Sequence, residues 1–386
     1  MVFRIGPKSE VLFGEGASEQ IGEKTKLLGC TRVLCVYDQG VKDAGIVGPV
    51  IEGLKKAGLE IIQFGGVLPD PPDTMINQCG ELARNGRVDG IVGIGGGSTL
   101  DTAKAVNVLL GNPGPIENYY IQPGASPHKP GKPLVLVPTT AGTASEITYV
   151  AVLTRTATGA KQGVLGPATI ASLAIVDPLL TLGLPPAITA TTGMDTFAHA
   201  LEAYTAAGRN MMSDVLSEKA IALTVQYLPK AVGNGSDVEA RTNMSFACLI
   251  AGMAFTDAKT HFGHAFGHSL GARHHVPHGT GCAIAQPGVI AVVAEHLPEK
   301  VRRVGELMGL LLGNDLSPAE LGRKVSERIA AFNREIGVPT LKQLRITESD
   351  LAPLAEGLMK DICFSFMPVK LGREEVLKVI EGLYAA

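Results

Sequence analysis

The sequence predicts an α/β protein with two domains, in which a parallel sheet flanked by helices is followed by an all-helical half. Three observations support this fold class. The 386 residues are too many for one ordinary core. In the first half, short apolar runs alternate with helical patterns, which is typical of a parallel sheet. From residue 187 onward, apolar residues recur at helical spacing. We place the α/β domain at residues 1–184 and the helical domain at residues 185–386.

Composition and charge indicate a soluble globular protein. Hydrophobic residues make up 45% and charged residues 18% of the chain, and 34 basic against 37 acidic residues leave a formal charge of -3. Because there is no basic block, neither a nucleic acid nor an anionic membrane surface has electrostatic support as a partner. The N-terminus lacks the basic start and apolar run of a signal peptide, so we expect a cytoplasmic protein. Six scattered cysteines without a Cys-x-x-Cys pair agree with a reducing compartment.

The first half alternates strands and helices in order. The predicted strands are short segments within 3–16, then 31–38, 59–67, 88–98, a run that begins at 134, and a last strand within 168–186. The predicted helices between them lie at 17–28, 39–58, 72–86 and 98–110. Ligands of such sheets bind at the carboxyl ends of the strands, so the residues at those ends are the candidates for a binding site.

Two features at strand ends suggest a bound nucleotide. Gly95 to Ser98 end one strand and open a helix, whose free N–H groups and dipole suit a phosphate, so Gly96, Gly97 and Ser98 form a candidate cradle. The pattern is not the Gly-x-Gly-x-x-Gly fingerprint, and a plain tight turn is the alternative. Asp38 ends an earlier strand and is the kind of acid that binds ribose hydroxyls, although it could equally cap the next helix.

A third strand runs into hydroxyl-bearing residues. Thr139, Thr140 and Thr143 follow the run that begins at 134, and small side chains there let backbone approach a flat ligand while hydroxyls bond amide or phosphate groups. Taken alone, a Ser/Thr-rich loop that caps a helix would explain the same residues.

The second half carries an unusual concentration of histidine. Residues 261–278 hold six of the nine histidines in the chain, which suggests a bound metal or proton chemistry. The helical patterns of this half lie at 187–206, 211–231, 238–257, 261–273, 286–312, 317–335, 348–360 and 372–384.

Two pairs of residues spaced four apart could supply metal ligands. His264 and His268 share one helix face, as do Asp195 and His199 in GMDTFAHALEAY. We expect His278 to enter the same space from a Pro-His-Gly turn after Pro277 breaks the helix. One carboxylate and three imidazoles suit a divalent transition metal with a position left open. On spacing alone, His268 could also be a metal ligand. Cys282 is the only cysteine near the histidines and is a minor candidate for lining the site.

Four long motifs, in the correct order, make the chain resemble the iron-containing (group III) alcohol dehydrogenases almost from end to end. They are GGGSTLDTAK at 95–104, PTTAGTASE at 138–146, GMDTFAHALEAY at 193–204 and HAFGHSLGARHHVPHG at 264–279. The resemblance implies a fold of the dehydroquinate synthase type, with a nucleotide-binding α/β domain and a helical metal-binding domain. It also implies a homodimer or higher homo-oligomer and a small alcohol or aldehyde as substrate.

The resemblance also assigns roles to individual residues. It makes Asp195, His199, His264 and His278 the ligands of Fe(II) or zinc, and His268 a catalytic residue near the nicotinamide that does not bind the metal. The cofactor would lie on Gly96, Gly97 and Ser98, with Asp101 nearby, then on Thr139, Thr140 and Thr143, with Lys161 at the ribose. Asp38 then favours NAD over NADP.

Several positions depart from the family's common pattern. Phe266, Gly267 and Cys282 stand where Met, Ala and Asn are frequent, and Arg273, His274 and His275 are unusual. These positions border the substrate side in the family, so they bear on the choice of substrate. Arg273 could pair with a substrate carboxylate, but a solvent-facing arginine is the more ordinary interpretation.

The expected reaction is a metal-dependent hydride transfer between NAD(H) and a small alcohol and its aldehyde or ketone, with His268 relaying the proton to water. The alternative is a metal-independent NADH-dependent reductase of the maleylacetate reductase type, which lacks an intact ligand set. A lyase resembling dehydroquinate synthase would need more basic residues around the metal than Arg273 and Lys259. A non-catalytic metal-binding module would leave the Gly-rich and Thr-rich motifs unexplained.

Overall fold

A computed structural model describes residues 5–6, 9–122 and 128–385 of the chain. The chain folds into two compact units, and it passes from the first to the second between Gly183 and Leu184. The start of the chain is grouped with the second unit, since the Gly6 N–H donates to Asp257 Oδ1 at 3.0 Å. The sequence analysis assigned those first residues to the α/β domain. Residues 3, 4, 7 and 8 of the first predicted β segment lie outside the described residues.

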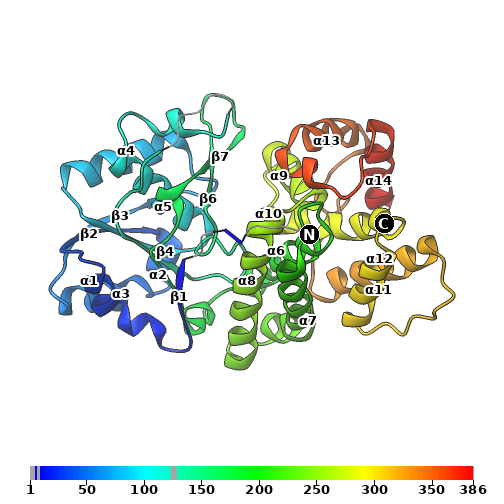
Figure 1. Cartoon of the computed structure of the whole chain (residues 1–386), viewed down its shortest axis with the longest axis horizontal. Helices are drawn as coiled ribbons and strands as arrows, with labels where there is room; N and C mark the ends of the chain where they lie inside the picture. Colours follow the sequence, from blue (N-terminus) through cyan, green and yellow to red (C-terminus); the bar gives the residue numbers. More distant parts are fainter. Residues whose placement is uncertain (1–4, 7–8, 123–127, 386) are drawn as a thin grey trace. The chain divides into compact units, whose positions relative to one another are not determined.

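The first unit contains a parallel sheet of six strands in the order β1-β8-β5-β4-β2-β3, which confirms the predicted sheet (Figure 1). The strands are β1 (Glu10–Phe13), β2 (Arg32–Asp38), β3 (Glu60–Val67), β4 (Gly90–Gly95), β5 (Leu134–Pro138) and β8 (Leu173–Val176). The helices are α1 (Ile21–Leu27), α2 (Gln39–Asp43), α3 (Val47–Lys56), α4 (Asp73–Asn85) and α5 (Gly97–Gly111).

The central strands are buried on both faces, which explains their continuous apolar sequence. Leu34 and Val36 of β2 join one core cluster, and Val33 and Cys35 of the same strand join another. Successive side chains of a strand point to opposite faces, so β2 contributes alternately to the two cores. Both clusters are needed to hold β4 and β5, at whose carboxyl ends the Gly-rich and Thr-rich segments begin.

Two details of the first unit differ from the prediction. The single helix predicted over 39–58 is two helices, α2 and α3, because the chain turns at Gly45 with φ 77°. Residues 150–165 form an antiparallel hairpin of β6 (Val150–Thr154) and β7 (Lys161–Leu165), which the sequence analysis did not predict. The second strand of this hairpin, KQGVL, has five residues with its two apolar side chains adjacent, so it lacks the apolar alternation that marks a strand.

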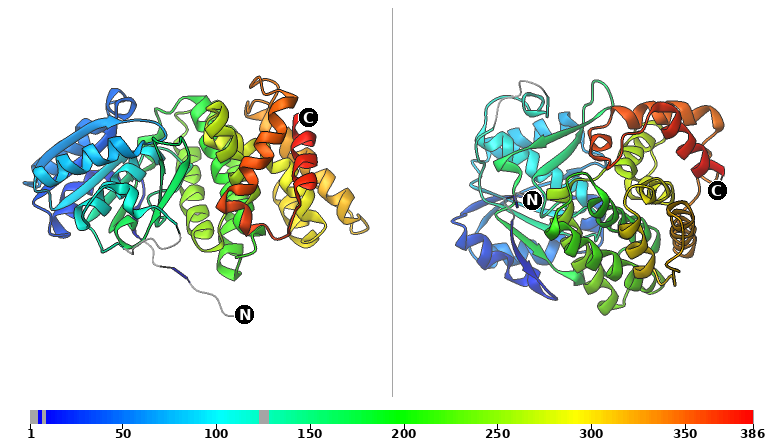
Figure 2. Two further views of the ribbon diagram at one scale, coloured as in Figure 1. Left: turned by 90° about the horizontal axis from the view of Figure 1, so that it is seen from above. Right: turned by 45° about the vertical axis from the view of Figure 1, so that its right-hand side comes forward.

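The second unit consists of helices throughout its described residues, as predicted (Figure 2). They are α6 (Pro186–Thr205), α7 (Met211–Gly233), α8 (Val238–Ala258), α9 (Phe262–His274), α10 (His278–Ala294), α11 (Pro298–Leu307), α12 (Pro318–Glu335), α13 (Glu348–Lys360) and α14 (Arg373–Ala385). Helix α6 contacts α7, α8, α9 and α10, and it is buried on all sides from Gly193 to Thr205. Polar residues on α6 are therefore enclosed by protein.

Two predicted boundaries in this unit were wrong. His278 does not enter from a loop but is the first residue of α10, which starts directly after Pro277. Proline is compatible with the start of a helix, because no intrahelical hydrogen bond needs its missing N–H there. The turn from α9 to α10 is therefore short. The predicted helix over 286–312 is divided into the end of α10 and the separate helix α11, which starts at Pro298.

Within the described part of the chain, no helix has the length and apolar character needed to cross a bilayer.

A buried lysine holds the segment after β5 against α5. Lys104 is fully buried, and its Nζ donates to Thr148 Oγ1 and to the carbonyl of Val150, both at 2.9 Å. Its Nζ lies 3.7 Å from Asp101 Oδ1. Burial lowers the pKa of Lys104 to about 8 even though Asp101 and Glu146 oppose the change. This ammonium group is therefore part of the framework and depends on its three partners.

We expect the substitution Lys104→Ala to lower the free energy of unfolding by about 3–5 kcal/mol, because it leaves the carboxylate of Asp101 buried without its cation. Denaturant titration followed by circular dichroism measures the change. The matched control is Lys55→Ala, which removes an exposed pair with Glu52 at 3.2 Å and should cost about 1 kcal/mol or less. Equal effects of the two substitutions would contradict a structural role for Lys104.

Candidate metal centre and nucleotide-binding turn

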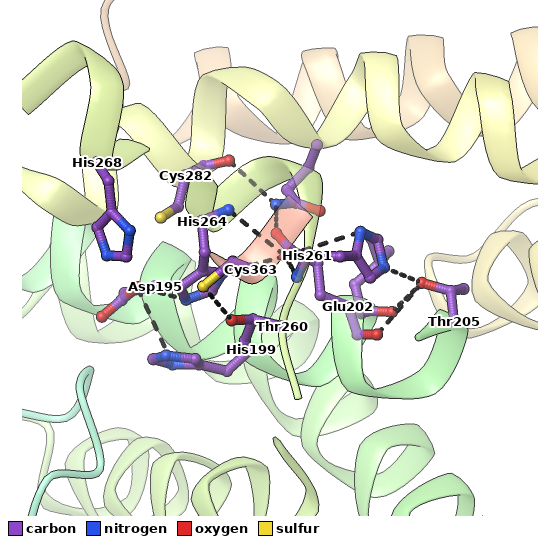
Figure 3. Close-up of polar contacts among 12 residues, drawn as sticks. Asp195, His199, Glu202, Thr205, Thr260, His261, His264, His268, Cys282 and Cys363 are labelled. Carbon is purple, nitrogen blue, oxygen red and sulfur yellow. Dashed lines mark hydrogen bonds and ion pairs between the residues drawn. The ribbon is translucent and has the colours of Figure 1, made fainter. Parts of the chain in front are cut away.

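Residues from three helices of the second unit meet at the Asp195 carboxylate, which comes from the buried helix α6. Its Oδ1 lies 3.7 Å from His264 Nε2, 3.6 Å from His278 Nε2 and 4.0 Å from His199 Nδ1. His264 belongs to α9, and His278 is the first residue of α10. Figure 3 shows Asp195, His199 and His264 pointing toward one another. The structure therefore places three imidazoles around one carboxylate. The ligand atoms of Asp195, His264 and His278 lie within 4.8 Å of one another, whereas His199 approaches only at 4.0 Å from Asp195 and is not part of that compact group.

The turn between α9 and α10 places two of these histidines side by side. His275 ends α9 in a left-handed conformation with φ 54°, and its N–H donates to the carbonyl of Gly271 at 3.0 Å. Such a turn closes the helix and reverses the chain within a few residues. The rings of His264 and His278 consequently have centroids 5.3 Å apart.

Spacing and burial fit a divalent metal. Two donors about 2.1 Å from one ion in a tetrahedral arrangement are about 3.4 Å apart, close to the separations measured here. Asp195 Oδ1 and His264 Nε2 are buried and have no hydrogen-bond partner among the described residues. Burial raises the pKa of Asp195 to about 6, with Glu202 adding to the increase and His264 opposing it. A divalent cation would neutralise the Asp195 carboxylate and give the His264 nitrogen a partner.

Glu202 is a second buried carboxylate at this centre, and the sequence analysis missed it. Its Oε2 lies 3.2 Å from His264 Nδ1, and its Oε1 accepts a hydrogen bond from Gln286 Nε2 at 2.7 Å. Burial alone would raise the pKa of Glu202, but His264 and His261, with hydrogen bonds from His264 and Gln286, lower it to about 2. A carboxylate 3.2 Å from Nδ1 favours the proton on that nitrogen, which leaves Nε2 as the donor atom on the side of Asp195.

The contribution of Glu202 was detectable in the sequence. It lies seven residues after Asp195 and three after His199, so all three fall on one face of α6. In the described part of the chain, the ion pairs of Asp195 and Glu202 are with histidines. With the imidazoles neutral, the two carboxylates carry two negative charges, which one divalent cation would neutralise.

The other histidines of residues 261–278 have separate roles. His261 is fully buried, and burial lowers its pKa to about 4, with His264 acting in the same direction and Glu202 opposing it. Its Nε2 lies 2.9 Å from the Thr205 hydroxyl. His274 Nε2 lies 3.7 Å from Asp350 Oδ1. The adjacent Arg273 is exposed, as expected for a solvent-facing arginine.

His268 lies beside the centre and has its own carboxylate partner. Its ring stacks on that of His278 with centroids 5.0 Å apart, and its Nδ1 is 2.8 Å from Asp361 Oδ2. Because an ionised carboxylate can only accept, Nδ1 donates to Asp361, and in the neutral ring Nε2 is the nitrogen that can accept a proton. Asp361 stands 93 residues away in the chain, so no spacing in the sequence pointed to it.

In the first unit, the Gly-rich turn and the Thr-rich segment pack against each other. A Cβ atom on Gly97 would lie 2.7 Å from Thr143 Cγ2, and one on Gly96 would lie 3.4 Å from Thr140 Cγ2. No side chain caps the start of α5, which begins at Gly97. The amides of Thr99 and Leu100 donate to the Gly96 carbonyl, both at 3.0 Å, so Gly97 and Ser98 carry the amides of this turn that an anion could use.

The remaining predicted cofactor residues of this unit already have protein partners. Asp38 caps α2 by accepting from Val41 N at 3.0 Å, as the sequence allowed, and it also accepts from the Thr99 hydroxyl at 3.0 Å. Asp101 accepts hydrogen bonds from the Ser145 hydroxyl at 2.6 Å and from Val152 N at 2.9 Å. Lys161 bonds Asp70 and, at 3.2 Å, the Thr154 hydroxyl. Thr139 is buried directly after β5. Their contacts with a cofactor stay predictions.

Comparison with known proteins covers nearly the whole chain. The family model "iron-containing alcohol dehydrogenase" matches residues 7–178, and the model of the C-terminal part of that family matches residues 189–384. The 1,3-propanediol dehydrogenase of Citrobacter freundii is 37% identical over 377 residues, which cover 96% of each chain. The NAD-dependent methanol dehydrogenase of Bacillus methanolicus is 33% identical over 381 residues, covering 98% of this chain and 99% of the relative.

A solved structure shows the same fold. The crystal structure of a 1,3-propanediol oxidoreductase superposes with a TM-score of 0.93 at 35% identity and covers 99% of this chain and 100% of its own.

We expect Glu202→Gln to weaken binding of a divalent metal by about 10- to 100-fold, because an amide lacks the negative charge of the carboxylate and attracts the Nδ1 proton of His264 less strongly. Equilibrium titration with Co(II) or Zn(II) against a competing chelator measures the dissociation constant. The control is Glu239→Gln on α8, which is exposed and bonds the Tyr227 hydroxyl at 3.0 Å. Unchanged affinity in Glu202→Gln would remove Glu202 from the support of the metal centre.

Proposed function

The chain belongs to the iron-containing alcohol dehydrogenase family, and we propose that Asp195, His199, His264 and His278 hold its metal. It is an NAD-dependent oxidoreductase that transfers a hydride between NAD(H) and a small alcohol and its aldehyde or ketone, with Fe(II) as the metal. The observation that carries the ligand assignment is the convergence of three imidazoles on the Oδ1 atom of Asp195.

When bound, the metal supplies a Lewis acid that makes an alcohol more acidic and polarises a carbonyl. The protein's own part is to hold the donors in place. His199 stacks on Phe255 with ring centroids 4.1 Å apart, and His264 is held through Nδ1 by Glu202. Rings fixed in this way present their donor nitrogens without further reorganisation.

We assign the proton transfer to His268. Nδ1 of this ring is hydrogen-bonded to Asp361 Oδ2, so Nε2 is the nitrogen that would exchange a proton with the substrate. During oxidation, Nε2 would accept the hydroxyl proton of the alcohol and pass it to water, and in the reverse direction it would return that proton to the carbonyl oxygen. Its stacking on His278 keeps the ring beside the ligand set.

We place the cofactor on the first unit. The amide groups of Gly96, Gly97 and Ser98 would bind the pyrophosphate, and Thr139, Thr140 and Thr143 would lie along the nicotinamide half. Asp38, at the carboxyl end of β2, disfavours a 2′-phosphate by charge repulsion and so supports NAD over NADP. We further propose that Asp101 lies near the phosphates and that Lys161 contacts the ribose.

We also propose a reducing, cytoplasmic location and a homo-oligomer of two or more copies. None of the six cysteines, all of which are described, forms a disulfide, which agrees with a reducing compartment. Met211, Met212 and Val215 expose apolar surface at the start of α7. Light scattering of the purified protein measures the number of copies.

An NADH-oxidation assay over aldehydes, ketones and oxo-acids, with protein reconstituted separately with Fe(II) and Zn(II), tests the proposal. We expect His264→Ala and His278→Ala to lose metal retention and turnover together, because each removes a donor from the ion. Metal analysis of the same preparations measures how much metal each variant retains. A variant that keeps stoichiometric metal and full activity would exclude that residue from the ligand set. Turnover of the wild-type protein stripped of metal would instead support the metal-independent reductase.

We expect Gly97→Ala to weaken NADH binding by at least about tenfold, because the added methyl group displaces Thr143 and the start of α5. Nicotinamide fluorescence measures the dissociation constant. The control is Gly48→Ala in α3, where the new Cβ has no heavy atom within 4 Å. NADH binding at wild-type strength in Gly97→Ala would argue against a cofactor seated on this turn.

A further inference from the structure

Cys282 carries a further potential donor into the centre formed by Asp195, His264 and His278. It lies four residues after His278, one turn further along α10 and on the same face. Its Sγ is 3.5 Å from His278 Nε2, and its side chain is fully buried. Figure 3 shows its sulfur beside His264 and Asp195.

The sulfur belongs to a compact set of donor atoms. One ligand atom each from Asp195, His264, His278 and Cys282 can be chosen so that all four lie within 4.8 Å of one another. Asp195 Oδ1 and His264 Nε2 in this set are buried and lack hydrogen-bond partners among the described residues. The set therefore contains unsatisfied oxygen and nitrogen donors next to the thiol, which is the requirement for a shared ion.

The packing of α9 against α10 restricts the sulfur to this position. A Cβ atom on Gly267 of α9 would lie 2.9 Å from Cys282 Sγ. A Cβ atom on Gly281 would lie 2.8 Å from the Cα of Gly267, so the two helices touch backbone to backbone at this point. The small residue at 267 gives the thiol room beside the donors, and the close helix contact leaves it little space elsewhere.

We propose that Cys282 is a further ligand of the metal, so that the centre is a mixed nitrogen, oxygen and sulfur site. This rests on the proposed function, because it needs the ion at the four predicted ligands. Binding forms a bond between sulfur and the metal and breaks the S–H bond, and the proton goes to solvent. No electron is transferred. Thiolate is a softer donor than imidazole or carboxylate, so the site gains affinity for zinc and cobalt.

The test uses Co(II) as the probe, added to the full-length protein from which metal has been removed. We expect one ion per chain and a near-ultraviolet absorption band from sulfur-to-cobalt charge transfer. Cys282→Ser and Cys282→Ala should lose that band and bind Co(II) more weakly, while still binding one ion. The control Cys79→Ala removes a buried thiol from α4 in the other unit and should keep the full band.

The outcomes separate this inference from the proposed function. If the wild-type protein binds one Co(II), loses it in His264→Ala and shows no charge-transfer band, then Cys282 is not a ligand although the metal centre stands. If no Co(II) binds at all, both proposals fail. Because the wild-type spectrum alone can overturn the assignment, the result does not depend on whether either Cys282 variant folds.

Discussion

The burial of two carboxylates in the middle of α6 is the constraint on which the helical unit depends. Asp195 and Glu202 are both almost inaccessible to water, and ionised groups in such a place need compensating charge. The protein provides imidazoles, which are neutral donors when they bind a metal and positive only when protonated. In the metal-free chain, burial lowers the pKa of His264, but Glu202 and Asp195 outweigh that effect and raise it. A bound divalent cation would compensate the charge of the two carboxylates without protonation of a histidine.

The helix packing of the second unit follows from this demand. Helix α9 ends at His274 and α10 begins after Pro277, so that His264 and His278 face one carboxylate from two directions. The glycines of α9 and α10 allow these helices to approach closely, as the contact between Gly267 and Gly281 shows. In the first unit the recognition groups are different, because backbone amides at the start of α5 replace ionised side chains. One unit thus suits a cation, and the other suits a phosphate.

Local spacing made much of the fold predictable, and together with the family resemblance it identified the residues that meet at Asp195. The Asp195 and His199 pair is spaced for one helix face, and the apolar strands β2, β4 and β5 are buried on both sides as their sequences indicate. Residues whose partners are remote were not predictable in the same way. Asp361 is paired with His268 only through the tertiary fold, and the hairpin of β6 and β7 has too little apolar alternation to identify it. The helical start at His278 was missed because Pro277 was taken only as a helix breaker, whereas proline is also favoured at helix starts.

The central claim is that Asp195, His199, His264 and His278 bind one metal ion on which hydride transfer depends. Crystals of the active, iron-loaded protein allow the most direct measurement, an anomalous difference map recorded at the iron absorption edge. The account predicts a single strong peak within about 2.0–2.3 Å of donor atoms from these four residues. A map with no peak there, from crystals of protein that still oxidises NADH with an aldehyde, would contradict it.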